Sequence, residues 1–159
     1  MESGEWRVES REFIIITVQN LTKVFSRMQN ISFVFETLDV YQKVRQLVKD
    51  IYLLLENFPS FERYTLCDQI RRAAVSVPSN IAEGYGRFSL KERLHFIEIS
   101  YGSLMEVYCQ LSIASDLGFI NSDNYETTKI KINEIAKMLY GLRKSIQKDI
   151  NNTTKQPHK

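Results

Sequence analysis

The sequence has few of the residues that mark several large classes of protein. Its 159 residues include only two cysteines, too few for a disulfide scaffold and without the Cys-x-x-Cys spacing of a zinc site. Six glycines and three prolines are scarce for the many turns of a β-sandwich. No apolar run approaches the roughly 18 residues that a membrane span needs. The length and the 43% hydrophobic content indicate one globular domain.

Residues that carry catalysis are also scarce. His95 and His158 are the only histidines, and Gly84-Tyr85-Gly86-Arg87 lacks the strand context and third glycine of a dinucleotide fingerprint. Cys67 and Cys109 are expected to be small buried hydrophobes in a reducing cytoplasm. We therefore expect a cytoplasmic protein that is not an enzyme and that uses no metal or cofactor.

The hydrophobic pattern predicts four helices between residues 34 and 150. The first covers about 37–58, where apolar residues recur at spacings of three and four: Val40, Val44, Leu47, Ile51, Leu54 and Phe58. The second covers about 61–85 with Ser60 as N-cap, and Pro78 in its interior predicts either a kink or two abutting helices.

The third predicted helix opens with a capping box formed by Ser89 and Glu92, and it ends at Gly118 as the C′ residue. One apolar line is a bundle seam, made of Leu90, Leu94, Ile97, Tyr101, Leu104, Tyr108 and Leu111. A second line lies on another face and comprises Phe96, Ser103, Val107 and Ala114. Two apolar faces place this helix centrally or at a subunit contact.

The fourth helix is predicted from about 123 to 150, with Asp123 and Glu126 as a cap pair. Long helices and short loops favour an all-α, antiparallel up-down four-helix bundle over residues 34–150. Residues 1–33 contain a strand-like run, 13–18, and are expected to be a weakly ordered or docked extension, or else a specific docking arm. Residues 151–159 are expected to be a disordered polar tail.

The net charge of +2 conceals a polarised segment. Residues 129–148 hold six basic side chains and only one acid, Glu134, a local charge of +5. The basic residues are Lys129, Lys131, Lys137, Arg143, Lys144 and Lys148. At about 100° per residue, all of them except Lys131 fall on one arc, away from most of the apolar side chains. The arc is either an ordinary solvated face or a surface for phosphate groups, which bind Lys and Arg by counterion release.

Residues 69–87 are unlike an average helix, because they combine small residues, paired arginines and an interior proline. Ser76, Asn80 and Glu83 share one face at spacings of four and three, and Arg71, Arg72 or Arg87 could partner them. In the third helix, Gly102 and Ser103 would permit close packing, and Glu106 could pair with an arginine of the second helix. These polar residues either support the proline site or contact RNA or a partner.

Three stretches carry a resemblance to a known family. They are RRAAVSVPSNIAEGYGR at 71–87, IYLLLENFPSFERYTL at 51–66 and ISYGSLMEVYCQL at 99–111. The sequence resembles, over about residues 36–148, the bacterial four-helix bundle proteins encoded in intervening sequences of 23S ribosomal RNA genes. Their relatives include the accessory protein of diversity-generating retroelements. The resemblance implies a homo-oligomer, a pentamer, in the bacterial cytoplasm, and in the retroelement relatives the assembly binds nucleic acid and a reverse transcriptase.

Together these observations favour a homo-oligomeric protein that binds RNA or a ribonucleoprotein through a basic helix face. The candidate contact residues are Lys137, Arg143, Lys144, Lys148, Arg71, Arg72 and Arg87. The alternative is a protein–protein assembly module, or a reverse-transcriptase accessory subunit, without nucleic-acid specificity of its own. No membrane partner is expected.

Overall fold

The computed structural model describes residues 17–19 and 32–154. Four long helices dominate: α2 (Asp39–Leu55), α3 (Leu66–Gly86), α4 (Leu90–Asp116) and α5 (Ser122–Thr154). Two short 3-10 helices, η1 (Val34–Thr37) and η2 (Ser60–Glu62), precede α2 and α3. The described ranges contain no strand, and the prediction of an all-α helical bundle is confirmed.

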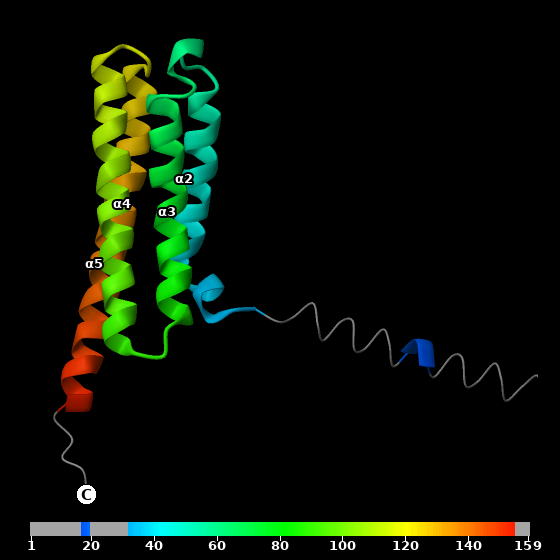
Figure 1. Ribbon diagram of the computed structural model, residues 1–159, viewed down its shortest axis with the longest axis vertical. Coiled ribbons are helices and arrows are strands. Elements are labelled where there is room, and N and C mark those ends of the chain that lie inside the picture. The colour runs from blue at the N-terminus through cyan, green and yellow to red at the C-terminus, as the bar shows by residue number, and fades with distance from the viewer. Residues whose placement is uncertain (1–16, 20–31, 155–159) are drawn as a thin grey trace, which may run out of the picture. The chain divides into compact units, whose positions relative to one another are not determined.

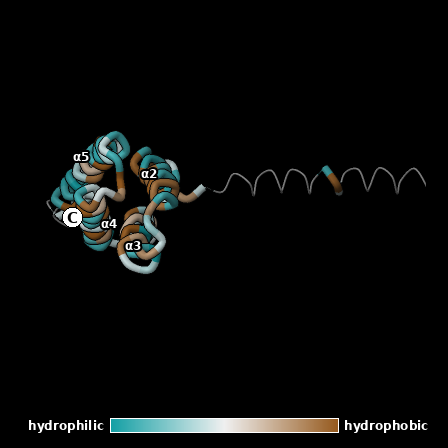
Figure 2. Tube along the Cα trace, turned by 90° about the horizontal axis from the view of Figure 1, so that it is seen from above, coloured by the Kyte–Doolittle hydropathy of each residue, from teal (hydrophilic) through white to brown (hydrophobic). Residues whose placement is uncertain are grey.

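The four helices form a closed ring of contacts. They lie side by side, and short connections join each to the next at alternating ends (Figure 1). Contacts link α2 to α3, α3 to α4, α4 to α5 and α5 back to α2. Seen from above, α3 and α5 therefore occupy opposite corners of the bundle (Figure 2).

The predicted apolar positions form the core with small changes in register. Val40, Val44, Leu47 and Ile51 are buried as expected, but Leu55 rather than Leu54 completes the buried face of α2. In α4 both predicted apolar lines contribute to the interior, through buried residues that include Ile97, Leu104, Ser103, Val107 and Ala114. The two-faced pattern of α4 is thus explained by its contacts with α3 and α5, and it requires no subunit contact.

Several helix boundaries differ from the predictions. α3 begins at Leu66 with Thr65 at the N-cap position, because η2 and a turn occupy the residues that follow Ser60. α3 also runs unbroken through Pro78, so the interpretation of two abutting helices is wrong. Ser89 occupies the N-cap position of α4, but its side chain makes no capping hydrogen bond, and the predicted capping box is not formed.

The end of α4 and the start of α5 are fixed by side-chain and backbone caps. Gly118 has a φ of 75°, and Phe119 N–H donates to the Ala114 carbonyl over 2.9 Å, so the predicted C′ role of this glycine is confirmed. Asn121, not Asp123, caps α5, because its Oδ1 accepts the Asn124 N–H over 2.8 Å.

The chain beyond the four helices was predicted in less detail. Residues 17 and 18, assigned to a strand-like run, are helical, while the rest of that run and most of the extension lie outside the described residues. α5 continues to Thr154, so residues 151–154 belong to the helix rather than to a polar tail. His158 lies outside the described residues.

The most extensive helix–helix contact joins α3 and α4. The buried positions of α3 include three small residues, Ala73, Ala74 and Gly84. A Cβ added to Gly84 would lie 3.0 Å from the Phe96 Cβ and 3.2 Å from the Arg93 backbone oxygen. A larger residue at position 84 would therefore crowd the α3–α4 contact unless α4 shifted by a few tenths of an ångström.

We predict that Gly84→Ala lowers the free energy of unfolding by about 1–3 kcal/mol, because the added methyl group overpacks the contact with a backbone oxygen. Alanine forms helices better than glycine, so without the close contact this substitution would raise the free energy of unfolding. A decrease therefore indicates the close contact with α4. Urea denaturation at fixed protein concentration measures it.

Gly141→Ala is the matched control in α5, since a Cβ there would meet nothing within 4 Å. We expect this variant to gain about 0.5–1 kcal/mol from helix propensity. A Gly84→Ala protein as stable as the control would contradict the close approach.

Candidate nucleic-acid interface

Half of the basic side chains in residues 129–148 are neutralised by ion pairs. The Lys129 Nζ lies 3.0 Å from Glu126 Oε1, one turn earlier on α5. Lys131 reaches across to α2, where its Nζ lies 2.7 Å from Asp50 Oδ2, and the Arg143 Nε donates to Glu98 Oε1 of α4 over 2.8 Å. Glu134, the one acid of this segment, is itself paired with Lys43 of α2 at 2.7 Å.

The Asp50–Lys131 pair is held firmly in its charged form. Burial alone would raise the pKa of Asp50, but the hydrogen bonds from Lys131 and Gln46 and the charges of Lys131 and Lys49 together lower the pKa of this carboxyl. Lys131 lies off the predicted basic arc, and from this side of α5 it reaches Asp50 of α2.

Three lysines remain for an external partner. Lys137, Lys144 and Lys148 are exposed and make no ion pair with any residue that the structure describes. Their spacings of seven and four place them on one face of α5. The Lys144 Nζ lies 4.9 Å from the centre of the Tyr140 ring. We call Lys137, Lys144 and Lys148 the lysine stripe.

The three candidate arginines in or directly after α3, namely Arg71, Arg72 and Arg87, do not join this stripe, because α3 lies diagonally opposite α5. Arg72 pairs with Asp68 at 2.9 Å, and Arg71 stacks over Tyr52 with its Cζ 5.8 Å from the ring centre. Arg87 pairs with Glu83 and lies over Phe96, 4.8 Å from that ring centre. Each arginine thus already has a local partner within the domain.

The predicted polar motif separates into a connected seam and two outlying acids. Ser76 of α3 and Ser103 of α4 share a hydrogen bond of 2.9 Å, and Asn80 Nδ2 donates to the Ser76 Oγ over 2.9 Å. Glu83 pairs with Arg87, one of the arginines predicted as its partner. Glu106 accepts from Gln110 over 3.2 Å, so the predicted pairing of Glu106 with an arginine is wrong.

Side chains also add hydrogen bonds to the backbone beside Pro78, whose ring disrupts the helical ladder. The carbonyls of three successive residues, Val75, Ser76 and Val77, accept from Ser79, Asn80 and Ser100 respectively, each over 2.8 Å. This arrangement supports the structural interpretation of the polar motif.

Sequence reasoning missed several residues of this region. Ser100 is fully buried, and its position three residues before Ser103, on the same face, was the available signal. Gly102 does not permit close packing, because it is exposed and a Cβ there would meet nothing within 4 Å. Cys109 is exposed rather than buried, whereas burial raises the pKa of the Cys67 thiol and leaves it a poor nucleophile.

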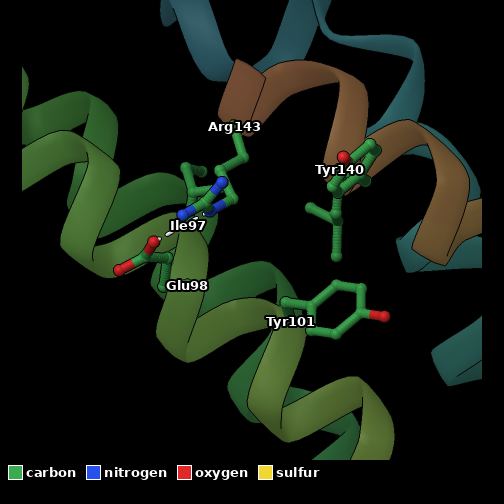
Figure 3. Close-up of a pocket in the computed structure, with 6 residues that line it drawn as sticks. Ile97, Glu98, Tyr101, Tyr140 and Arg143 are labelled. Carbon is green, nitrogen blue, oxygen red and sulfur yellow. Dashed lines mark hydrogen bonds and ion pairs between the residues drawn. The ribbon is translucent and has the colours of Figure 1, made fainter. Parts of the chain in front are cut away.

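A pocket with a volume of about 310 Å³ opens between α4 and α5 beside the lysine stripe. Tyr101 and Tyr140 extend from the two helices on one side of it, and Arg143 reaches Glu98 on the other (Figure 3). Ile97 and Leu139 complete its lining. The two tyrosines are 40% and 52% exposed. The sequence analysis had assigned Tyr101 to the bundle seam and had not singled out Tyr140.

Neither a metal site nor a membrane span is found among the described residues. No group of three or more His, Cys, Asp or Glu residues is placed there to hold a metal ion. None of the helices described is both long enough and apolar enough to cross a membrane.

Comparisons with known proteins agree with the helical fold. A family model described as 23S rRNA-intervening sequence protein matches residues 36–141. A crystal structure from the S23 ribosomal protein family of Bacteroides thetaiotaomicron VPI-5482, a protein with unknown function, is similar with a TM-score of 0.60 and 23% identity. The similarity covers 66% of this chain and 98% of that one, and at this identity it shows the fold alone. No curated protein matches the chain.

We predict that Ser76 and Ser103 are energetically coupled across the α3–α4 contact. In a double-mutant cycle with Ser76→Ala and Ser103→Ala, we expect a coupling of about 0.5–1.5 kcal/mol in the free energy of unfolding, the net contribution of one hydrogen bond. Denaturant titration of the four proteins measures it.

The control cycle uses Ser79→Ala in place of Ser76→Ala. The Ser79 hydroxyl donates to the Val75 carbonyl of its own helix. Ser79→Ala and Ser103→Ala should be additive within about 0.5 kcal/mol. Equal coupling in the two cycles would show that the Ser76–Ser103 hydrogen bond does not stabilise the α3–α4 contact.

Proposed function

The chain belongs to the 23S rRNA-intervening sequence protein family, and on this premise we propose that it is a non-enzymatic protein of the bacterial cytoplasm that binds RNA through the lysine stripe. The observation that carries the proposal is the exposure of Lys137, Lys144 and Lys148 on one face of α5, without an acidic partner among the described residues.

Only some of the candidate basic residues are unpaired, and this limits the proposed RNA contact to the lysine stripe. Arg143 is engaged by Glu98, and Arg71, Arg72 and Arg87 each have a partner near their own helix. The three stripe lysines keep their full charge available to phosphate groups, which they bind with release of counterions. Contacts of this kind position the RNA and carry little sequence information.

We predict that the triple substitution of Lys137, Lys144 and Lys148 by Glu abolishes most RNA binding. The slope of log K against log salt should fall by about 0.9 for each duplex phosphate contact that is lost. Fluorescence anisotropy with a labelled RNA duplex, repeated over a series of salt concentrations, measures the affinity and the slope together.

A charge-matched control replaces Arg45, Lys49 and Arg63 by Glu. These exposed side chains lie on α2 and just after η2, and they make no ion pair in the described part of the chain. The control changes the net charge by the same amount, so near wild-type binding is expected. Equal loss in both variants would indicate a general charge effect and would refute the stripe as the binding face.

We propose further that the protein self-associates through the outer face of α4. Ile99 and Ile113 are exposed on this face, and the small residues Gly102 and Cys109 lie between them, so that successive spacings are three, seven and four. A second copy packed there would bury these side chains, and an assembly would present the lysine stripe in several copies, which raises the avidity for RNA. The implied pentamer and reverse-transcriptase partner stay predictions.

We predict that Ile113→Glu shifts the protein toward monomer, because the substitution places an unpaired charge within this contact face. Multi-angle light scattering at micromolar concentration measures the mass. Ile130→Glu is the control, since Ile130 is 67% exposed on α5, away from the α4 face. A wild-type protein that is monomeric throughout this range would refute self-association.

A further inference from the structure

The pocket between α4 and α5 is lined by aromatic and apolar side chains that have no part in the proposed phosphate contacts. Tyr101 and Tyr140 present exposed aromatic rings, and Ile97 and Leu139 supply apolar surface between the helices. An opening that combines aromatic walls with a few polar groups is typical of a site for a flat organic ring.

Tyr140 also belongs to the same face of α5 as the lysine stripe. It follows Lys137 by three residues and precedes Lys144 by four, and the Lys144 ammonium lies 4.9 Å from its ring centre. A nucleic-acid strand whose phosphates lie along the stripe would therefore pass directly over the tyrosine. Alternation of cations and aromatic rings is the usual arrangement of sites that bind single strands.

We infer that this pocket receives one unpaired base of a single-stranded RNA, which stacks on Tyr101 or Tyr140 while its neighbouring phosphates contact the lysine stripe. The inference rests on the proposed function, and it adds a preference for single-stranded over duplex RNA. Bases of a duplex are stacked and paired, whereas unpaired bases can turn outward onto aromatic side chains.

The charges inside the pocket cancel in the Glu98–Arg143 ion pair, which suits a neutral base better than a phosphate group. The Glu98 carboxylate forms part of the lining and would repel a phosphate, whereas it can accept a hydrogen bond from an amino group of a base. Arg143 donates its Nε–H to Glu98 and has further N–H donors in its guanidinium group for ring or carbonyl acceptors. The ion pair thus offers donors and an acceptor at the edge of the pocket.

The experiment compares a labelled 12-nucleotide unstructured RNA with a duplex of the same length by fluorescence anisotropy. The double variant Tyr101→Leu, Tyr140→Leu should bind the single strand about tenfold more weakly, the loss expected for one base stack. Its affinity for the duplex should stay within about twofold of wild type. Tyr140→Phe in a wild-type background should keep single-strand binding, because phenylalanine keeps the stacking face.

Tyr64→Leu is the matched control, since Tyr64 is an exposed tyrosine beyond η2 and does not line the pocket. Circular dichroism verifies that each variant keeps its helix content. Undiminished single-strand binding by the double variant, or equal losses for single strand and duplex, would overturn the pocket assignment and leave the lysine stripe standing.

The glutamate triple variant of the lysine stripe separates this inference from the proposed function. If that variant loses binding to both RNAs, and the tyrosine variant loses binding only to the single strand, both proposals are supported. Unchanged binding in the lysine variant overturns the proposed function but not the stacking site, provided that the tyrosine dependence is found. A wild-type protein that binds neither RNA overturns both.

Discussion

The close packing of α3 against α4 is the constraint on which the rest of the structure depends. At Gly84 the two backbones approach so closely that a single methyl group would crowd the Arg93 carbonyl. Short side chains are required along such a contact, and short polar ones must find hydrogen-bond partners there. The Ser76–Ser103 bond and the bond from Ser100 to the Val77 carbonyl meet this requirement across the two helices. The same bonds lie beside Pro78, where the backbone of α3 has lost a donor.

The positions of the helices were predictable because burial imposes a period of three and four on apolar residues. Val40, Val44, Leu47 and Ile51 follow this period, and all four are buried. The ends of helices depend on interactions that the period does not record. Ser89 has the sequence of a capping box yet makes no capping bond, whereas Asn121 caps α5 without a glutamate three residues later.

The candidate site was only partly predictable, for a related reason. Gly84 and Gly102 are both glycines within predicted helices, and only their neighbours on the adjacent helix show which one lies at a close contact. The summed charge of +5 over residues 129–148 likewise does not distinguish paired from unpaired members of the six basic residues. Lys131 is neutralised by a residue 81 positions away and Arg143 by one 45 positions away, and such pairs are visible only after the helices have packed.

The geometry of the bundle explains why Lys144 and Lys148 stay unpaired. α2 begins at Asp39, and Lys43, one turn later, pairs with Glu134 of α5. Since each residue of a helix rises about 1.5 Å, the later turns of α5 extend past the first turn of α2. Lys144 and Lys148 are in those later turns, beyond the reach of Asp50 and of the other α2 side chains that form pairs with α5. There α4 is the neighbour that remains, and its Glu98 is engaged by Arg143. The length of α5 relative to α2 therefore leaves Lys144 and Lys148, two of the three lysines of the stripe, without an α2 partner.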